Sequence, residues 1–323
     1  GIWSGVCLME YDGRILCVNT NQANDDNELL KKTGNRVQNN VSYSTNQPGS
    51  SIKPISVYAP ALENNLITYG SVLKDEPLPN YFDDGSAGPN NFEGTFAGTV
   101  NVDQAITESL NAPVAQLINQ MSPLVSYQFL TQNLHITSLS EEDSYNVGGV
   151  AIGGLTNGIS VREMTGAYQI FGNGGSYTPP HYIKSIVGAD GETLYSYSSE
   201  PVRGVSENTA WIMNRMLRSN VQMEDGLGRY ASIDGIEVIG KTGTRDNISE
   251  VVTDQWFAGG TPDMCAALWI GSDDQNLLKS AGTYPSSSKV WSNVMSAITN
   301  KNPSFTPCGD TVSAEVCRVS GGI

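Results

Sequence analysis

Short apolar runs lie near the two ends of the chain, and their spacing predicts strands. Near the start, Val6–Glu10 and Arg14–Val18 flank Tyr11-Asp12-Gly13, which is typical of a tight hairpin turn. Three later runs have the β-branched or aromatic character of strands: Ile236–Thr242, Gln255–Gly260 and Met264–Gly271. We expect these five strands to form one antiparallel sheet, with all of its strands supplied by the two ends of the chain.

Between these ends the apolar residues change to helical spacing. Ser160 and Glu163 form a capping box at the start of the segment Val161–Asn173, and Gly174-Gly175 predicts its end. Two further helices are predicted at Asn208–Ser219 and Lys289–Thr299, and a small hairpin is predicted around Asp190-Gly191. This order predicts an α+β fold, in which a five-stranded antiparallel sheet is flanked by helices and carries an inserted helical subdomain. Residues 20–47 and 63–100 are rich in Asn, Asp, Pro and Gly, which predicts long loops.

Composition limits the partners and the compartment. The 323 residues, 39% of them hydrophobic, suffice for one large domain with its own core. A net charge of −15 disfavours binding to nucleic acid or to an anionic membrane surface, because both would repel the chain. Only 16% of the residues are charged, which favours an extracytoplasmic protein. No run approaches the ~20 apolar residues of a membrane helix and no signal peptide is present, so we expect a mature domain or a trimmed fragment.

The cysteines allow more than one interpretation. There are five of them, at positions 7, 17, 265, 308 and 317, and none lies in a C-x-x-C pair that would indicate zinc. Cys308 and Cys317 either form a disulfide or remain free, and the same two alternatives hold for Cys7 and Cys17 on facing predicted strands. Neither of the two histidines lies in a motif beside a cysteine, so a nucleophilic cysteine is not expected. The sequence predicts no metal site and no cofactor.

Three motifs in a fixed order carry the candidate chemistry: Ser50-Ser51-Ile52-Lys53, Ser109-Leu110-Asn111 and Lys241-Thr242-Gly243-Thr244. Taken singly, the first also fits a capped surface helix, the second an ordinary helix end, and the third an edge strand protected by a lysine. Together they supply a nucleophile, two amines to move its proton, and a cationic strand for an anionic substrate. The set therefore favours a serine acyl-transfer enzyme.

The first motif is predicted to open a helix. Pro48 and Pro54 flank it, and proline is tolerated in the first turn of a helix but not in its interior. Ser50 is therefore expected at a helix N-terminus, where free N–H groups favour a developing oxyanion. Lys53 lies one turn further along, from where its amine reaches the Ser50 hydroxyl. Lys53 acts as the base only if burial or a second positive charge, such as Lys241, lowers its pKa.

The second and third motifs complete the predicted site. Pro113 forces a break, so Ser109 and Asn111 are expected in a turn at a helix end, where the hydroxyl relays a proton and the amide holds a substrate carbonyl. Lys241 is predicted to bind a carboxylate together with the hydroxyls of Thr242 and Thr244. Gly243 permits close approach of another backbone, and an exposed strand edge here would accept a peptide as an added strand. The N–H groups of Thr244 and Ser50 are expected to form the oxyanion hole.

The segments around these motifs resemble the penicillin-interacting serine acyltransferase superfamily, which contains penicillin-binding proteins and serine β-lactamases. Pro48-Gly49-Ser50-Ser51-Ile52-Lys53-Pro54 is similar to the family's P-G-S-T-x-K-P segment, with Ser51 in place of the usual Thr. Further similar segments are Pro89-Asn90-Asn91, Gly98-Thr99-Val100, Ser109–Pro113, Gly153–Ser160, Trp256–Gly259 and Trp269–Gly271. The similarity is greatest to the transpeptidase domain of Gram-positive class A penicillin-binding proteins. It implies a transpeptidase domain over residues 1–301 and a C-terminal tail over residues 302–323.

The resemblance implies a peptidoglycan D,D-transpeptidase that acts on stem peptides ending in D-Ala-D-Ala and is acylated by β-lactams. It implies a catalytic group of Ser50, Lys53, Ser109, Asn111 and Lys241, and substrate-binding residues Thr242, Gly243 and Thr244. It also implies an extracytoplasmic protein that is held at the cell membrane by a segment absent from this chain. Class A enzymes carry a glycosyltransferase domain upstream and no segment here resembles one, so we expect either that this domain was removed or that the chain is a monofunctional relative.

Other functions share these motifs. A D,D-carboxypeptidase differs only in using water as the acceptor, and a serine β-lactamase needs a group that drives water onto the acyl-enzyme. No segment after Ser109-Leu110-Asn111 clearly supplies such a group. A β-lactam sensor would acylate without turnover. A non-catalytic peptidoglycan-binding domain would lose the proton-transfer groups, whereas Ser50, Lys53 and Lys241 are all present.

Overall fold

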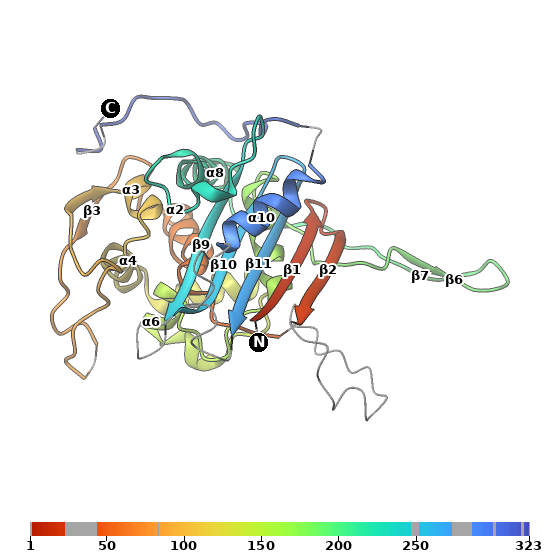
Figure 1. Cartoon of the computed structure of the whole chain (residues 1–323), viewed down its shortest axis with the longest axis horizontal. Helices are drawn as coiled ribbons and strands as arrows, with labels where there is room; N and C mark the ends of the chain where they lie inside the picture. The colour runs from red at the N-terminus through yellow and green to blue at the C-terminus, as the bar shows by residue number, and fades with distance from the viewer. Residues whose placement is uncertain are drawn as a thin grey trace.

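A five-stranded antiparallel sheet forms the centre of the computed structural model (Figure 1). The structure describes residues 2–22, 44–82, 84–246, 252–272, 286–299, 302–317 and 320–322. The strands are β1 (Ile2–Glu10), β2 (Ile15–Gln22), β9 (Ile239–Asp246), β10 (Val252–Gly260) and β11 (Met264–Ser272). Their order is β2-β1-β11-β10-β9, with every neighbouring pair antiparallel. The predicted sheet and α+β class are confirmed, and β9, which carries the third motif, is an edge strand.

The two faces of the sheet contact different helices because successive strand residues point to opposite sides. On β1, Cys7 and Met9 belong to the larger core cluster, whereas Leu8 belongs to a second cluster. The second cluster includes Trp291 and Met295 of α10 (Ser287–Ser296), which lies in front of the sheet in Figure 1. Both faces are therefore buried, which makes the sheet a rigid support for its edge strand.

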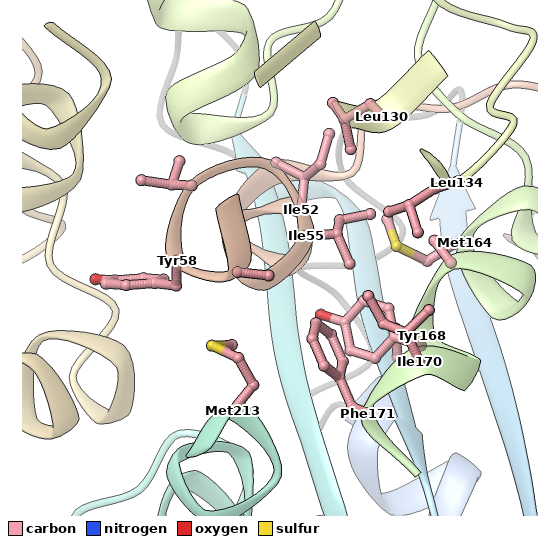
Figure 2. Packing of buried hydrophobic residues seen from close by; sticks show 14 of the residues in the cluster. Ile52, Ile55, Tyr58, Leu130, Leu134, Met164, Tyr168, Ile170, Phe171 and Met213 are labelled. Carbon is pink, nitrogen blue, oxygen red and sulfur yellow. The ribbon is translucent and has the colours of Figure 1, made fainter. Parts of the chain in front are cut away.

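The larger cluster also contains the helical region, and the first motif passes through it. Ile52 of the motif, with Ile55 and Tyr58 directly after it, packs among Leu130, Tyr168 and Phe171 (Figure 2). The helices of this region are α2 (Ala59–Glu63), α3 (Val102–Thr107), α4 (Ala112–Met121), α5 (Pro123–Gln128), α6 (Val147–Ile152), α7 (Val161–Tyr168) and α8 (Glu207–Gln222). Shorter turns are η1 (Gly49–Ile52), η2 (Pro54–Tyr58), η3 (Phe129–Asn133), η4 (Glu141–Ser144), η5 (Gln169–Phe171) and η6 (Arg229–Ala231).

The predicted helices are present with small changes at their ends. The capping box of Ser160 and Glu163 is formed at the start of α7, which continues as the tighter turn η5. Gly174 and Gly175 follow with φ of 75° and 90°, the left-handed region that ends a helix and favours glycine. Ser206 caps α8, whose last residue is Gln222.

Short hairpins stand outside the main sheet. The segment 63–100, predicted as a loop, contains β3 (Val72–Asp75), which pairs with β4 (Gly98–Asn101). The hairpin predicted around Asp190-Gly191 is confirmed as β6 (Ser185–Val187) and β7 (Thr193–Ser196), and it projects from the body of the domain in Figure 1. A third small pair joins β5 (Ser176–Tyr177) to β8 (Val202–Arg203). Most of the other predicted loop, residues 23–43, lies outside the described residues.

No disulfide joins any of the five cysteines, all of which lie in the described ranges. In the β1–β2 register Cys7 lies opposite Val18 and Cys17 lies opposite Leu8, so the two thiols point to opposite faces of the sheet. Neither of the two possible disulfides, Cys7–Cys17 or Cys308–Cys317, is therefore present in the described part of the chain. Among the described residues, no helix is both long and apolar enough to cross a membrane.

Candidate active site

Ser50 lies in the short turn η1, which begins directly after Pro48. The expected helix start beside Ser50 is therefore confirmed, although the turn is a 3₁₀ helix rather than an α-helix. The Lys53 N–H donates to the Ser50 carbonyl, which places the two residues one turn apart. Ser51 is buried and its hydroxyl donates to the Pro48 carbonyl at 2.8 Å, whereas Ser50 is half-buried. Of the two adjacent serines, Ser50 is the one within reach of a substrate.

Glycines allow two separated segments to pack closely against this turn. A Cβ on Gly243 would lie 2.1 Å from the Pro48 carbonyl oxygen, and one on Gly49 would lie 2.3 Å from the Thr244 carbonyl oxygen. A Cβ on Gly153, directly after α6, would lie 2.2 Å from the Gly49 carbonyl oxygen. No side chain fits at such distances, so the strand β9 and the end of α6 pack backbone to backbone against the turn. The close approach predicted at Gly243 is confirmed.

Lys53 is fully buried and its ammonium nitrogen donates three hydrogen bonds. The acceptors are the Ser109 carbonyl at 2.8 Å, the Leu110 carbonyl at 3.0 Å and the Asn111 side-chain oxygen at 2.6 Å. All three belong to the turn between α3 and α4, where the sequence predicted Ser109 and Asn111 to lie. The first two motifs are therefore joined through the lysine side chain.

Lys241 reaches the same turn from the edge strand. Its ammonium nitrogen donates to the Ser109 hydroxyl at 2.8 Å and to the Thr242 carbonyl at 3.3 Å. Ser109 has φ of 59°, a left-handed conformation that is unusual for serine and indicates local backbone strain. Its carbonyl accepts from Lys53 while its hydroxyl accepts from Lys241, so Ser109 connects the two amines.

Burial sets the charge of both lysines. It lowers the pKa of Lys53 well below the usual 10.5, and the positive charge of Lys241 lowers it further. Burial also lowers the pKa of Lys241, to about 7. A buried ammonium loses hydration, so the neutral amine becomes accessible near neutral pH. A neutral amine is what a proton acceptor for a serine hydroxyl requires.

The remaining predicted residues follow the alternation of β9. Lys241 and Gly243 are buried on one face of the strand, while Thr242 is half-buried and Thr244 exposed on the other. Within the part of the chain that the structure describes, neither lysine ammonium donates a hydrogen bond to the Ser50 hydroxyl. The structure thus brings together the two lysines, Ser109 and Asn111, and places the Ser50 turn against the same strand.

Other polar side chains support the site without having been predicted. The Tyr168 hydroxyl donates to the Ser51 carbonyl at 2.6 Å, and the Trp256 indole N–H donates to the Gln47 carbonyl at 2.9 Å. Asn91 accepts from the Asn111 N–H at 2.7 Å and donates to the carboxylate of Asp75. Asn91 and Trp256 lie in segments that resemble the family, Tyr168 lies in a predicted helix, and no motif marks Asp75.

A serine turn packed against an edge strand, with two buried lysines meeting beside it, is an arrangement suited to serine acyl transfer. The protein-family model described as penicillin binding protein transpeptidase domain matches residues 4–295 of this chain. The chain therefore belongs to the penicillin-binding protein transpeptidase family.

Individual relatives agree with this assignment. Penicillin-binding protein 1F of Bacillus subtilis is 36% identical over 244 residues, covering 74% of this chain and 32% of that protein. Penicillin-binding protein 1A of Clostridium botulinum is 30% identical over 290 residues, covering 87% of this chain and 34% of that protein. These curated relatives are class A penicillin-binding proteins of Gram-positive bacteria. The chain spans about a third of their length.

Solved structures share the fold. Penicillin-binding protein PonA1 of Mycobacterium tuberculosis has a TM-score of 0.77 at 22% identity, covering all of this chain and 83% of that chain. A second structure of PonA1, in complex with penicillin V, has a TM-score of 0.76 at 23% identity and covers 94% of this chain and 80% of that chain. These structures therefore have the same overall arrangement of helices and strands as this chain.

Proposed function

We propose that this domain is a peptidoglycan D,D-transpeptidase that works through an acyl-enzyme on Ser50. One observation supports the proposal most strongly. Two buried lysines with lowered pKa values meet at Ser109, and the half-buried Ser50 lies on a turn packed against the strand of one of them. This arrangement provides a proton acceptor, a proton relay and a cation within one site.

In the acylation step, the Ser50 hydroxyl oxygen forms a bond to the carbonyl carbon of the penultimate D-Ala. Its proton passes to the neutral amine of Lys53, and the carbonyl oxygen becomes an oxyanion that the N–H groups of Ser50 and Thr244 receive. The bond between this carbon and the terminal D-Ala nitrogen then breaks. The leaving nitrogen takes a proton through the Ser109 hydroxyl, which Lys241 contacts at 2.8 Å.

In the second step, an amine of a neighbouring stem peptide attacks the ester and Ser50 regains its proton. The charge of Lys241, with the hydroxyls of Thr242 and Thr244, holds the terminal carboxylate of the donor peptide at the edge strand. Asn111 holds a backbone carbonyl of the same peptide. β-Lactams present a similar carbonyl and carboxylate, so they acylate Ser50 in place of the peptide.

The setting of the domain is part of the proposal. Its curated relatives are class A penicillin-binding proteins, and the part of this chain that aligns with them covers only about a third of their length. We therefore propose that the full protein is extracytoplasmic, is held at the cell membrane by a segment outside this chain, and carries a glycosyltransferase module.

The test is covalent labelling with a fluorescent penicillin, followed by peptide mass spectrometry. We expect one persistent adduct per chain on Ser50, and none on a Ser50→Ala variant, because only this hydroxyl of the turn is accessible. Ser51→Ala is the matched control and should still be labelled. Label on another residue, or no label on the folded protein, would contradict the proposal.

The same experiment separates the competing functions. Label that appears and disappears within seconds, while a chromogenic cephalosporin is consumed, would indicate a serine β-lactamase. Release of D-Ala from a stem peptide without cross-linked product, when an acceptor amine is supplied, would indicate a D,D-carboxypeptidase.

A further inference from the structure

A buried carboxylate lies behind the second motif and is not part of the proposed mechanism. Asp75, the last residue of β3, is 0% exposed. Its two oxygens accept from the Asn91 side-chain nitrogen at 2.8 and 3.0 Å, and one of them also accepts from the Ala97 N–H at 2.7 Å. No ion pair of Asp75 is present in the described ranges of the chain. A buried carboxylate costs free energy unless it is hydrogen-bonded, so the bonds from Asn91 and Ala97 hold Asp75 in its place.

Asn91 connects this carboxylate to the site. Its side-chain oxygen accepts from the Asn111 N–H at 2.7 Å while its nitrogen faces Asp75. Asn111 is further held by its own side-chain nitrogen, which donates to the Asn90 carbonyl at 2.7 Å. The side-chain oxygen of Asn111 is then the acceptor of Lys53 at 2.6 Å. A continuous path of hydrogen bonds therefore runs from Asp75 to the amine of Lys53.

The charge of Asp75, together with the Thr95 carbonyl that accepts from the same Asn91 nitrogen at 3.0 Å, fixes the orientation of the Asn91 side chain. A carboxylate only accepts, so the Asn91 side chain has to present its NH₂ group to Asp75 and its oxygen to Asn111. A neutral amide at position 75 keeps its oxygen on the Ala97 N–H and turns its NH₂ group toward the Asn91 nitrogen, so the Asn91 side chain would have to turn over and lose its bond to the Thr95 carbonyl. In that orientation the Asn91 NH₂ group would face the Asn111 N–H, and two donors would meet without an acceptor.

We propose that Asp75 is a positioning residue of the acyl-transfer site, which acts through Asn91 to hold the Asn111 turn beneath Lys53. This inference rests on the proposed function. Asp75 contacts neither lysine nor Ser50, so its effect on the reaction is transmitted entirely through the orientation of two asparagine side chains.

The test exchanges the two residues of the pair. Asp75→Asn should slow acylation by penicillin about 10- to 100-fold, since a displacement near 1 Å at a reacting group has an effect of this size. The double variant Asp75→Asn/Asn91→Asp again pairs an amide with a carboxylate, and the carboxylate now also accepts from the Asn111 N–H. It should therefore recover part of the acylation rate, because the carboxylate at position 91 no longer donates to the Thr95 carbonyl.

The pH profile of acylation is a second readout, which a purely structural role would not change. If the Asn111 turn moves away, the Lys53 ammonium loses an acceptor, while Lys241 still faces it with a positive charge. The charged form of Lys53 is then less favoured, so the acid limb of the Asp75→Asn profile should move to lower pH. The exchanged pair should return this limb to its original position.

Asp143→Asn is the matched control, because Asp143 is also a fully buried carboxylate. It accepts from the Ser140 N–H and from the N–H and hydroxyl of Thr156, away from the lysines. This variant should lose stability but acylate at the parent rate per folded molecule.

Parent-like acylation by Asp75→Asn would overturn the inference. So would an exchanged pair that regains stability while it remains slow. Absence of labelling in the parent itself would instead contradict the proposed function.

Discussion

At the scale of single residues, the lysines depend most on their surroundings. A lysine on the surface is charged at every physiological pH and is a poor proton acceptor. Here, burial lowers the pKa of both Lys53 and Lys241, and the charge of Lys241 adds to the shift at Lys53. The two amines also share Ser109 as an acceptor, so a change at one lysine alters the surroundings of the other.

Lys241→Met should therefore move the acid limb of the acylation profile to higher pH. Lys53 accepts the Ser50 proton only when it is neutral, so the rate rises as pH passes through the pKa of Lys53. The charge of Lys241 lowers that pKa, and its removal raises it again. The acylation rate constant for a penicillin is measured between pH 5 and 9. The quantity compared is the pH at which this rate rises, not the maximal rate.

Lys289→Met is the control for this change, because Lys289 is exposed on α10, which packs on the opposite face of the sheet from the Lys241 side chain. Its profile should match that of the parent. An acid limb that stays in place or moves to lower pH in Lys241→Met would show that Lys53 does not sense Lys241 during acylation.

At the scale of elements, the start of α7 shows how one side chain joins a helix to a loop. The Glu163 carboxylate accepts from the N–H and hydroxyl of Ser160, which caps the helix. It also accepts from the N–H and hydroxyl of Thr137 and from the Ser138 N–H. The capping box was visible in the sequence, but the contact with residues 137–138 was not, because it joins segments 25 residues apart in the chain.

Glu163→Gln should lower the free energy of unfolding by about 1–3 kcal/mol at pH 7, because an amide has a single acceptor oxygen for these donors. Burial raises the pKa of Glu163, but the hydrogen bonds from Ser160 and Thr137 outweigh it, so the pKa lies below the usual 4.5. A lowered folded-state pKa gives stability above the unfolded value, which is lost as pH falls through the folded value. The difference between parent and variant should therefore shrink below about pH 4.

Urea unfolding at pH 7 and at pH 3.5 measures both parts of this prediction. Glu207→Gln is the control, since Glu207 also lies in a first helical turn but is half exposed and pairs with Arg203 only at 3.8 Å. Its effect should be small at both pH values. An equal loss in the two variants would refute a special role for Glu163.

At the scale of the whole molecule, residues 302–317 pack along the domain. Phe305 is 6% exposed and belongs to the larger core cluster, and its N–H donates to the Glu237 carboxylate at 2.9 Å. Further along, the Asp310 N–H donates to the Asn208 side chain at 2.8 Å, near the start of α8. The division into a domain of residues 1–301 and a tail of residues 302–323 remains a prediction, and the family model ends at residue 295.

Phe305→Ala should lower the free energy of unfolding by about 3–5 kcal/mol, the usual effect of removing a buried phenylalanine. Penicillin labelling of the folded variant should keep its stoichiometry, because Phe305 does not contact the site. Val312→Ala is the control, since Val312 is 89% exposed. Chemical denaturation compares the three proteins, and equal midpoints would show that the tail adds nothing to the stability of the domain.

The sequence by itself determined the elements and the chemistry they carry. Alternating apolar residues, capping serines and turn glycines are local signals, so the five strands, the α7 capping box and the hairpin at Gly191 were predictable. The three motifs also identified Ser50, Ser109 and Lys241 as candidates, because their residue types and order are visible without a fold.

Only the tertiary structure decided how these residues meet. The left-handed Ser109, the three acceptors of Lys53 and the lowered pKa values arise when α3, α4, β9 and the Ser50 turn pack together. No sequence pattern marks Asp75, because the sequence around an aspartate at a strand end does not distinguish a solvated side chain from one that is buried against Asn91. Burial and long-range hydrogen bonds depend on which segments become neighbours, and no local pattern encodes that.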